Sequence, residues 1–295
     1  MTIQTFARRL FKDRHGYFFI APGYLVFIVF LFIPVLAAII LAFFDTNYVK
    51  FTWVGLGNFQ TLAKDSGFRR AVINTLTYVG VVVPSTVTLS LLIALLVYPL
   101  GARLQTFFRA AFYLPGVAGG VVLSLVWIWI FNPAFGLLNW VLGQFGLEPV
   151  LWLATGKTSL WSVAIVVLTF TIGQPIILFL AGLGSIPGEI YDAALVDGAN
   201  RWQRVWYVTL PLLRPVFMFV LTTSTIGVFQ IWETIYMLTS GGPSKSSTSI
   251  VYMIYETAFL TSKYGLASAM GVVLMVFVVT ITFIQLRFWD VSYLE

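Results

Sequence analysis

Six long apolar runs restrict this chain to very few folds. The first begins at Tyr17, and the others are Val72–Leu100, Phe108–Phe131, Leu160–Gly184, Leu210–Ile231 and Ala267–Trp289. A helix needs about 20 consecutive apolar residues to cross the hydrocarbon core of a bilayer, and each run reaches that length. Because backbone groups in lipid must find their hydrogen bonds within the segment, each run is predicted to be a membrane-spanning α-helix. The predicted fold is an all-α integral membrane protein with six transmembrane helices.

The composition agrees with a chain that faces lipid. Apolar residues make up 59% of the sequence and charged residues only 9%, and the mean hydropathy is +0.94. So few charges cannot cover the surface of a soluble globule. The formal net charge of +6 comes from Lys and Arg residues in short segments between the apolar runs. This scattered pattern argues against nucleic acid binding, which needs basic residues gathered on one solvated face.

The charges flanking the first run predict the topology. Arg8, Arg9, Lys12 and Arg14 precede it, and basic flanks favour the cytoplasmic side of a membrane. The run is too long for the core of a signal peptide and shows no small-residue cleavage site, so it is predicted to remain as the first span. We therefore expect a cytoplasmic basic segment at 1–16 and a six-helix membrane domain at 17–295. Six spans place both termini in the cytoplasm, as expected for a multi-pass protein of a bacterial cytoplasmic membrane.

A polar stretch interrupts the apolar runs between Pro187 and Pro215. Its sequence, PGEIYDAALVDGANRWQRVWYVTLPLLRP, predicts a helix, a turn and a second helix. Pro187 suits a first helical turn, and Gly198 suits the left-handed position that ends a helix. The second helix is predicted to run from about Arg201 to Val208 and to end before Pro211. Small residues on one face of the first helix would let another protein approach closely.

The spacing within this stretch resembles the EAA loop of permease subunits in binding-protein-dependent ABC importers. The matching pattern is Asp192-Ala193-Ala194, then Gly198, then Val208-Thr209-Leu210-Pro211. In that family the loop is a cytoplasmic coupling helix that docks into the ATPase subunit. The resemblance implies that the coupling loop here covers about 187–211. The residues implied to contact the ATPase are Glu189, Asp192, Ala193, Ala194, Asp197, Gly198 and Ala199. The chain departs from the family at Asp192, where Glu is usual.

The segments expected on the outer side extend the resemblance to the sugar-type, MalF-like branch of these permeases. They are TWVGLGNFQTLAKDSGFRRAVINTL, FNPAFGLLNWVLGQFGL and LTSGGPSKSSTSIVYMIYETAF, and the similarity covers Trp53 to Trp289. It implies an ATP-driven sugar importer with a second permease subunit, expected to make a heterodimer. The other implied partners are a dimer of ATPase subunits that carries the ATP and magnesium, and an extracytoplasmic sugar-binding protein.

Polar side chains within two spans indicate where a substrate could pass. Polar groups at membrane depth are costly unless they face protein or a water-filled path. The fourth span carries Thr171 and Gln174 next to Pro175, which is expected to kink it. In the fifth span, Ser224 and Gly227 share one helical face. Carried over from the sugar branch, the candidate substrate-binding residues are Gln174 and Ser224, with Gly227 and Val228 beside them. Trp232 and Glu233, at the end of the polar fifth span, are further candidates. The alternative is that such hydroxyls only satisfy neighbouring carbonyls within their own helices.

The chain offers little for chemistry of its own. It has no cysteine and a single histidine, His15, in the basic N-terminal segment. No pair of carboxylates within the spans could serve as an acid and a base, so we expect neither an enzyme nor a bound metal or cofactor. The alternatives to a sugar permease are an ABC permease for a non-sugar solute and an ion-coupled secondary transporter. The second usually needs ionisable groups within its spans.

Overall fold

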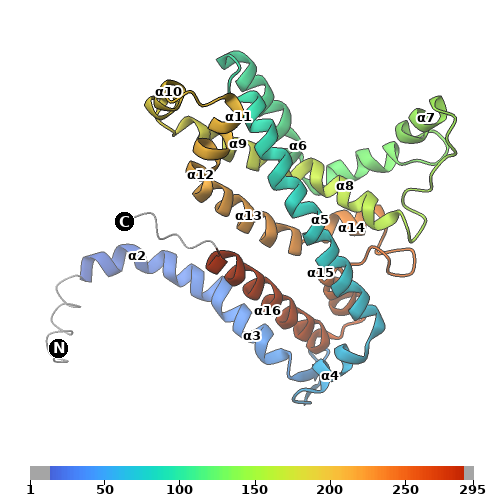
Figure 1. Ribbon diagram of the computed structural model, residues 1–295. Helices are drawn as coiled ribbons and strands as arrows, with labels where there is room; N and C mark the ends of the chain where they lie inside the picture. The colour runs from blue at the N-terminus through green and yellow to red at the C-terminus, as the bar shows by residue number, and fades with distance from the viewer. Residues whose placement is uncertain (1–13, 289–295) are drawn as a thin grey trace.

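The computed structural model describes residues 14–288. The predicted basic segment at 1–16 therefore lies largely outside the described residues, as does the C-terminal end. The chain forms helices joined by short connections, with one antiparallel hairpin of two three-residue strands (Figure 1). In chain order the elements before the third span are α2 (Arg14–Phe27), η1 (Ile28–Phe32), α3 (Ile33–Leu41), β1 (Phe44–Thr46), β2 (Phe51–Trp53), α4 (Gly57–Lys64) and α5 (Ser66–Val97). They are followed by α6 (Ala102–Ile130), α7 (Leu137–Gln144), α8 (Ser159–Thr171), α9 (Gly173–Gly184), α10 (Gly188–Val196), α11 (Arg201–Arg204), η2 (Val205–Thr209) and α12 (Leu210–Leu212). The last elements are α13 (Arg214–Phe229), α14 (Glu233–Leu238), α15 (Ile250–Tyr255), η3 (Glu256–Leu260) and α16 (Tyr264–Phe288).

The prediction of six membrane-spanning helices is confirmed, with two of them broken. Four helices are continuous and long enough to cross, at Phe18–Leu41, Ser66–Val97, Ala102–Ile130 and Tyr264–Arg287. The fourth span consists of α8 and α9, which meet at an angle of 42°, and the fifth runs from Arg201 to Phe229 with a bend of 67°. Helix α5 begins at Ser66, earlier than its apolar run, because Asp65 caps it by accepting hydrogen bonds from the backbone of Gly67 and Phe68.

The prediction that the helix after Gly198 ends before Pro211 is wrong. The chain stays helical through Leu212 and bends only at Leu213. The reason is the π-helical turn at Val205–Thr209, in which the backbone N–H of Leu210 bonds to the carbonyl of Val205. Pro211 then falls in the first turn of α12, where a missing N–H costs nothing.

The buried core lies between α5, α8, α9 and α13. Tyr78, Val167, Phe179 and Val220 are among its fully buried residues. The first span, α2 to α3, stays outside this bundle and lies along α16 (Figure 1), and none of its most apolar window is buried. The polar stretch carrying α10 and α11 lies at the opposite end of the molecule from α4 (Figure 1). The fold therefore separates the predicted coupling segment from α4, which belongs to a segment predicted to lie on the outer side.

Candidate functional site

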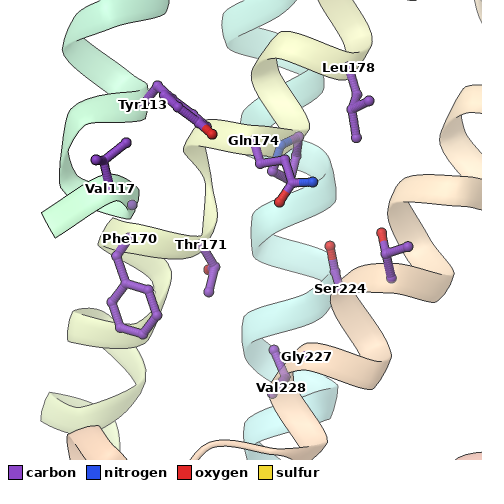
Figure 2. A pocket seen from close by; sticks show the side chains of 12 residues that line it. Tyr113, Val117, Phe170, Thr171, Gln174, Leu178, Ser224, Gly227 and Val228 are labelled. Atoms are coloured by element: carbon purple, nitrogen blue, oxygen red, sulfur yellow. The ribbon is translucent and has the colours of Figure 1, made fainter. Parts of the chain in front are cut away.

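A cavity of about 320 Å³ opens between α6, the break of α8 and α9, and α13. Four of the residues predicted to bind substrate line it together, namely Gln174, Ser224, Gly227 and Val228. Figure 2 shows the amide of Gln174 and the hydroxyl of Ser224 directed toward the space between the two spans. The other lining residues are Tyr113, Gly116, Val117, Phe170, Thr171, Pro175, Leu178 and Thr223. No residue of this lining carries a formal charge.

The break of the fourth span presents Gln174 to the cavity. A Cβ atom on Gly173 would collide with the backbone carbonyl oxygen of Phe112, so only glycine lets α9 begin this close to α6. Pro175 has no N–H, and the carbonyl of Thr171 therefore lacks its usual helical donor. This carbonyl and the Gln174 side chain lie at the same break. The kink expected at Pro175 is present, centred on Ile172.

Hydrogen bonding separates Ser224 from Thr223 and Thr225, whereas the hydroxyl of Thr222 also lacks a partner within the described part of the chain but is buried and does not line the cavity. Thr223 donates to the carbonyl of Phe219 at 2.7 Å, and Thr225 donates to that of Leu221 at 2.7 Å. These two residues fit the alternative that hydroxyls only satisfy their own helix. Among the described residues, neither Ser224 nor Gln174 has an intramolecular side-chain hydrogen bond. Their polar atoms are free for a ligand or for water.

The third wall, on α6, was missed from the sequence. Tyr113 and Val117 line the cavity from this helix, with Tyr113 leaning toward Gln174 (Figure 2). Gly116 allows the approach, because a Cβ there would lie 3.1 Å from the carbonyl oxygen of Phe170. The small-residue spacing of Gly116 and Gly120 was the available signal, and both glycines lie against other parts of the chain, whereas a Cβ on Gly119 would meet nothing within 4 Å. Tyr113 and Phe170 give the cavity aromatic faces, on which a sugar ring can stack.

Trp232 and Glu233 do not line the cavity, and their substrate role remains a prediction. Trp232 stacks on Tyr255 with ring centroids 5.2 Å apart, inside an aromatic cluster that includes Tyr236 and Tyr252. Glu233 lies beside α6, because a Cβ built on Gly120 would be 3.6 Å from the Glu233 Oε2. This Cβ would also be 3.6 Å from the ring of Phe170, which does line the cavity. Glu233 is thus a neighbour of the cavity wall rather than part of it.

The predicted coupling segment is an exposed helix followed by a tight turn. Helix α10 ends at Val196, and Gly198 has φ +77°, the left-handed conformation expected for it. The next helix begins at Asn200, whose side chain accepts a hydrogen bond from the backbone of Gln203 and completes a capping box. The side chain of Val196 is 88% exposed, a large apolar area for a position outside the bundle. Leu195 beside it and Trp202 on α11 are exposed as well, and a group of exposed apolar side chains of this kind favours a protein contact.

The coupling residues predicted from the sequence lie in or directly beside α10. Glu189, Asp192 and Ala193 are exposed, and Ala194 is half-buried. Asp197 ends the helix, and Gly198 and Ala199 form the turn. The hydroxyls of Tyr191 and Thr209 lie 3.1 Å apart, within hydrogen-bonding distance, and so join α10 to η2 at the base of the next span. The segment is therefore tied directly to the fifth span.

Comparison with known proteins identifies the family. Residues 54–290 match the family described as the binding-protein-dependent transport system inner membrane component. The chain belongs to this family. The match begins next to the expected start of the resemblance at Trp53 and covers every span except the first.

Several relatives extend over almost the whole chain. The multiple sugar-binding transport system permease protein MsmF of Streptococcus mutans is 31% identical over 95% of this chain and 97% of its own length. The probable ABC transporter permease protein YesP of Bacillus subtilis is 35% identical, covering 95% and 92%. The sn-glycerol-3-phosphate transport system permease protein UgpA of Brucella abortus is 32% identical, covering 92% and 93%.

The fold is shared with a solved importer. A chain of a bacterial ABC transporter involved in the import of the acidic polysaccharide alginate superposes with a TM-score of 0.86 at 24% identity. The superposition covers 99% of this chain and 100% of that one. This chain therefore has the same fold as that chain of the alginate transporter.

Proposed function

We propose that this chain is one of two permease subunits of an ATP-driven importer for a neutral sugar or oligosaccharide. The observation that carries the proposal is the uncharged cavity in which the free amide of Gln174 and the free hydroxyl of Ser224 face each other. A neutral carbohydrate needs hydroxyl-matching hydrogen bonds and apolar faces, and this cavity offers both. A volume of about 320 Å³ falls at the lower end of ligand pockets, which span about 300–1,000 Å³. A second permease subunit would add the opposite wall.

The lack of cations in the lining favours a neutral sugar over an anionic solute. A carboxylate or phosphate at membrane depth needs a basic or strongly donating partner. The relatives named for sugars, such as MsmF and the lactose transport system permease protein LacF of Rhizobium radiobacter, agree with a carbohydrate substrate. The ion-coupled alternative finds no support in the cavity, since none of its lining residues is ionisable at neutral pH.

The partners follow from the two ends of the molecule. The coupling segment would dock a separate dimer of ATPase subunits, which bind ATP and magnesium and perform the hydrolysis. Its Arg-rich surroundings, with Arg201 and Arg204 on α11 and Arg103 and Arg109 on α6, favour the cytoplasmic side. Both termini would then be cytoplasmic. An extracytoplasmic binding protein would deliver the sugar to the opposite end, and closure of the ATPases would rock the spans around the cavity.

The test is uptake by the reconstituted transporter. We expect Gln174→Leu and Ser224→Ala to raise the sugar concentration for half-maximal uptake by about 5- to 150-fold. This range corresponds to the roughly 1–3 kcal/mol lost when a buried hydrogen-bonding group loses its partner. Thr169→Val, in the same span as Gln174, is the matched control, because its hydroxyl donates to the Val166 carbonyl and Thr169 is not among the lining residues of the cavity. If both variants took up sugar like the unaltered transporter, the cavity would not be the sugar site.

A further inference from the structure

A second cavity, of about 680 Å³, lies at the other end of the bundle from the coupling segment. It is a groove between the first turns of α5 and the start of α8, closed on one side by the loop that joins α14 to α15. We call it the basic groove. Its lining residues are Ser66, Arg69, Arg70, Ile73, Asn74, Thr77, Gly156, Lys157, Leu160, Trp161, Pro243, Ser244 and Ser246.

Three cations and no carboxylate line the basic groove. The cations are Arg69, Arg70 and Lys157. Asp65, which precedes Ser66 and is not in the lining, has an Oδ1 that accepts hydrogen bonds from the backbone of Gly67 and Phe68. The Lys245 ammonium and the Asp65 carboxylate lie close together, because each comes within about 3 Å of a Cβ built on Gly67. The charge of Lys245 thus offsets that of Asp65. The groove therefore keeps a strong positive potential.

Most of the donors in the basic groove are unused. Arg70 donates one N–H to the carbonyl of Ser244 at 2.8 Å, which fixes its guanidinium and leaves its other donors free. Arg69 and Lys157 are exposed, and neither makes a side-chain hydrogen bond or ion pair with any residue that the structure describes. The arrangement suits an anion with several oxygen atoms, such as a phosphate group.

The floor of the basic groove is apolar and continues down the outside of the bundle. Ile73 is 57% exposed and Trp161 is 50% exposed. One turn further along each helix, Leu76 on α5 and Ile165 on α8 are exposed as well. A basic recess that continues into an apolar track between two membrane helices matches the shape of a lipid. The recess would hold the charged headgroup, and the track would hold an acyl chain.

The position of the groove along α5 matches the membrane surface. With 32 residues this helix is about 48 Å long, whereas the hydrocarbon core is only about 30 Å thick. Its first five residues, SGFRR, carry both arginines and must lie outside that core. Trp161 is half exposed at the start of α8, as is typical of aromatic residues at the level of the headgroups.

We propose that the basic groove binds the phosphate headgroup of an anionic phospholipid, with one acyl chain lying along Ile73, Leu76, Trp161 and Ile165. Arg69, Arg70 and Lys157 contact the phosphate, and Ser66 and Ser246 border it. The apolar track distinguishes a lipid from the other anions that could enter. A free phosphate would make no use of it, and a soluble acidic protein would not reach it.

The experiment uses the complete transporter in nanodiscs made of phosphatidylcholine with a minor fraction of phosphatidylglycerol. The phosphatidylglycerol that remains bound per complex after transfer to mild detergent is measured by mass spectrometry. The test variant combines Arg69→Gln, Arg70→Gln and Lys157→Gln. The control combines Lys50→Gln, Lys64→Gln and Lys263→Gln, which removes the same charge at the same end of the molecule but outside the basic groove.

We expect the test variant to lose at least tenfold in retained phosphatidylglycerol, because a basic residue near an anionic headgroup contributes roughly fivefold. The control is expected to retain the lipid. Lys157→Gln alone is expected to lower retained phosphatidylglycerol severalfold. Lys157 is exposed and has no partner among the described residues, so this single variant still tests the proposal if the triple variant assembles poorly.

Two other arms identify the occupant. Phosphatidylglycerol is expected to raise the melting temperature of the unaltered complex, and inorganic phosphate or glycerol phosphate is not. An equal rise with inorganic phosphate would overturn the proposal in favour of a free anion. Equal retention of phosphatidylglycerol by the test variant and the control would also overturn it, and weaker capture of the solute-binding protein by the test variant would then assign the groove to that protein.

Discussion

Gly173→Ala tests whether the close approach of α6 and α9 builds the sugar cavity. The added Cβ would collide with the carbonyl oxygen of Phe112 and lie 3.0 Å from the Cα of Tyr113. Both neighbours are backbone atoms, so no side-chain rotation can relieve the clash. Helix α9 must instead move away from α6, which separates Gln174 from Tyr113 and widens the cavity between them.

The expected cost follows from two opposing terms. Forcing an extra methyl group into a packed interior costs typically about 1–3 kcal/mol. The higher helix propensity of alanine returns at most about 1 kcal/mol, and less at a break in the helix. We expect the free energy of unfolding to fall by about 1–2 kcal/mol and sugar uptake to fall by more than the loss of assembled complex explains.

Gly80→Ala is the matched control. Gly80 lies within α5, and a Cβ there would meet nothing within 4 Å. This variant is expected to raise the melting temperature slightly or leave it unchanged. Melting temperature and uptake are measured on the same reconstituted preparations of both variants. If Gly173→Ala matched Gly80→Ala in both measurements, the reasoning from the Phe112 contact would be refuted.

Substitutions at three other positions test the proposed coupling segment and the α7 loop. Gly198→Leu should abolish sugar-stimulated ATPase activity while the chain still inserts, because φ +77° strains a branched side chain where the ATPase would dock; normal stimulation would remove Gly198 from the contact. Asp192→Glu should be tolerated, whereas Asp192→Lys should lower copurification of the ATPase subunits by reversing a charge on α10; an unchanged yield would contradict this role. Asn139→Ala should destabilise the α7 loop by about 2–4 kcal/mol, since the side chain bonds to Pro133, Val150 and Trp152, and limited proteolysis of that loop measures the effect.

The apolar runs were sufficient to predict the number of spans, because in lipid the length of a run decides whether it crosses. Two residues of the cavity were also predictable as a pair. Gln174 precedes a proline that breaks its span, and Ser224 lies on a polar face of the next span, so both local signals pointed inward. Their hydrogen-bonding state was not predictable. Ser224 and its neighbour Thr223 are both hydroxyl residues in the same polar stretch, so the sequence does not distinguish them. Only the structure shows that the Thr223 hydroxyl donates to the Phe219 carbonyl.

Contacts between distant segments could not be read in the same way. Tyr113 reaches the cavity because Gly116 and Gly173 let α6 approach the fourth span, and no local pattern states which helix a glycine will meet. The helix end predicted before Pro211 was also wrong, because it depended on backbone hydrogen bonds that the sequence does not show. A proline normally marks a helix end, but the π-helical turn before it shifts the hydrogen bonding by one residue and makes the proline harmless. Such a turn leaves no clear sign in the sequence.

The two broken spans are the ones that enter and leave the coupling segment. Their bends of 42° and 67° divide each span into an inner arm nearer α10 and an outer arm farther from it, and the inner arm α9 is itself part of the buried core. The Tyr191 to Thr209 contact ties α10 to the second inner arm. A displacement of α10 would therefore act on both inner arms, which meet their outer arms at Ile172 and Leu213. Ile172 lies two residues from Gln174, so a movement at the proposed ATPase contact would change the width of one wall of the cavity.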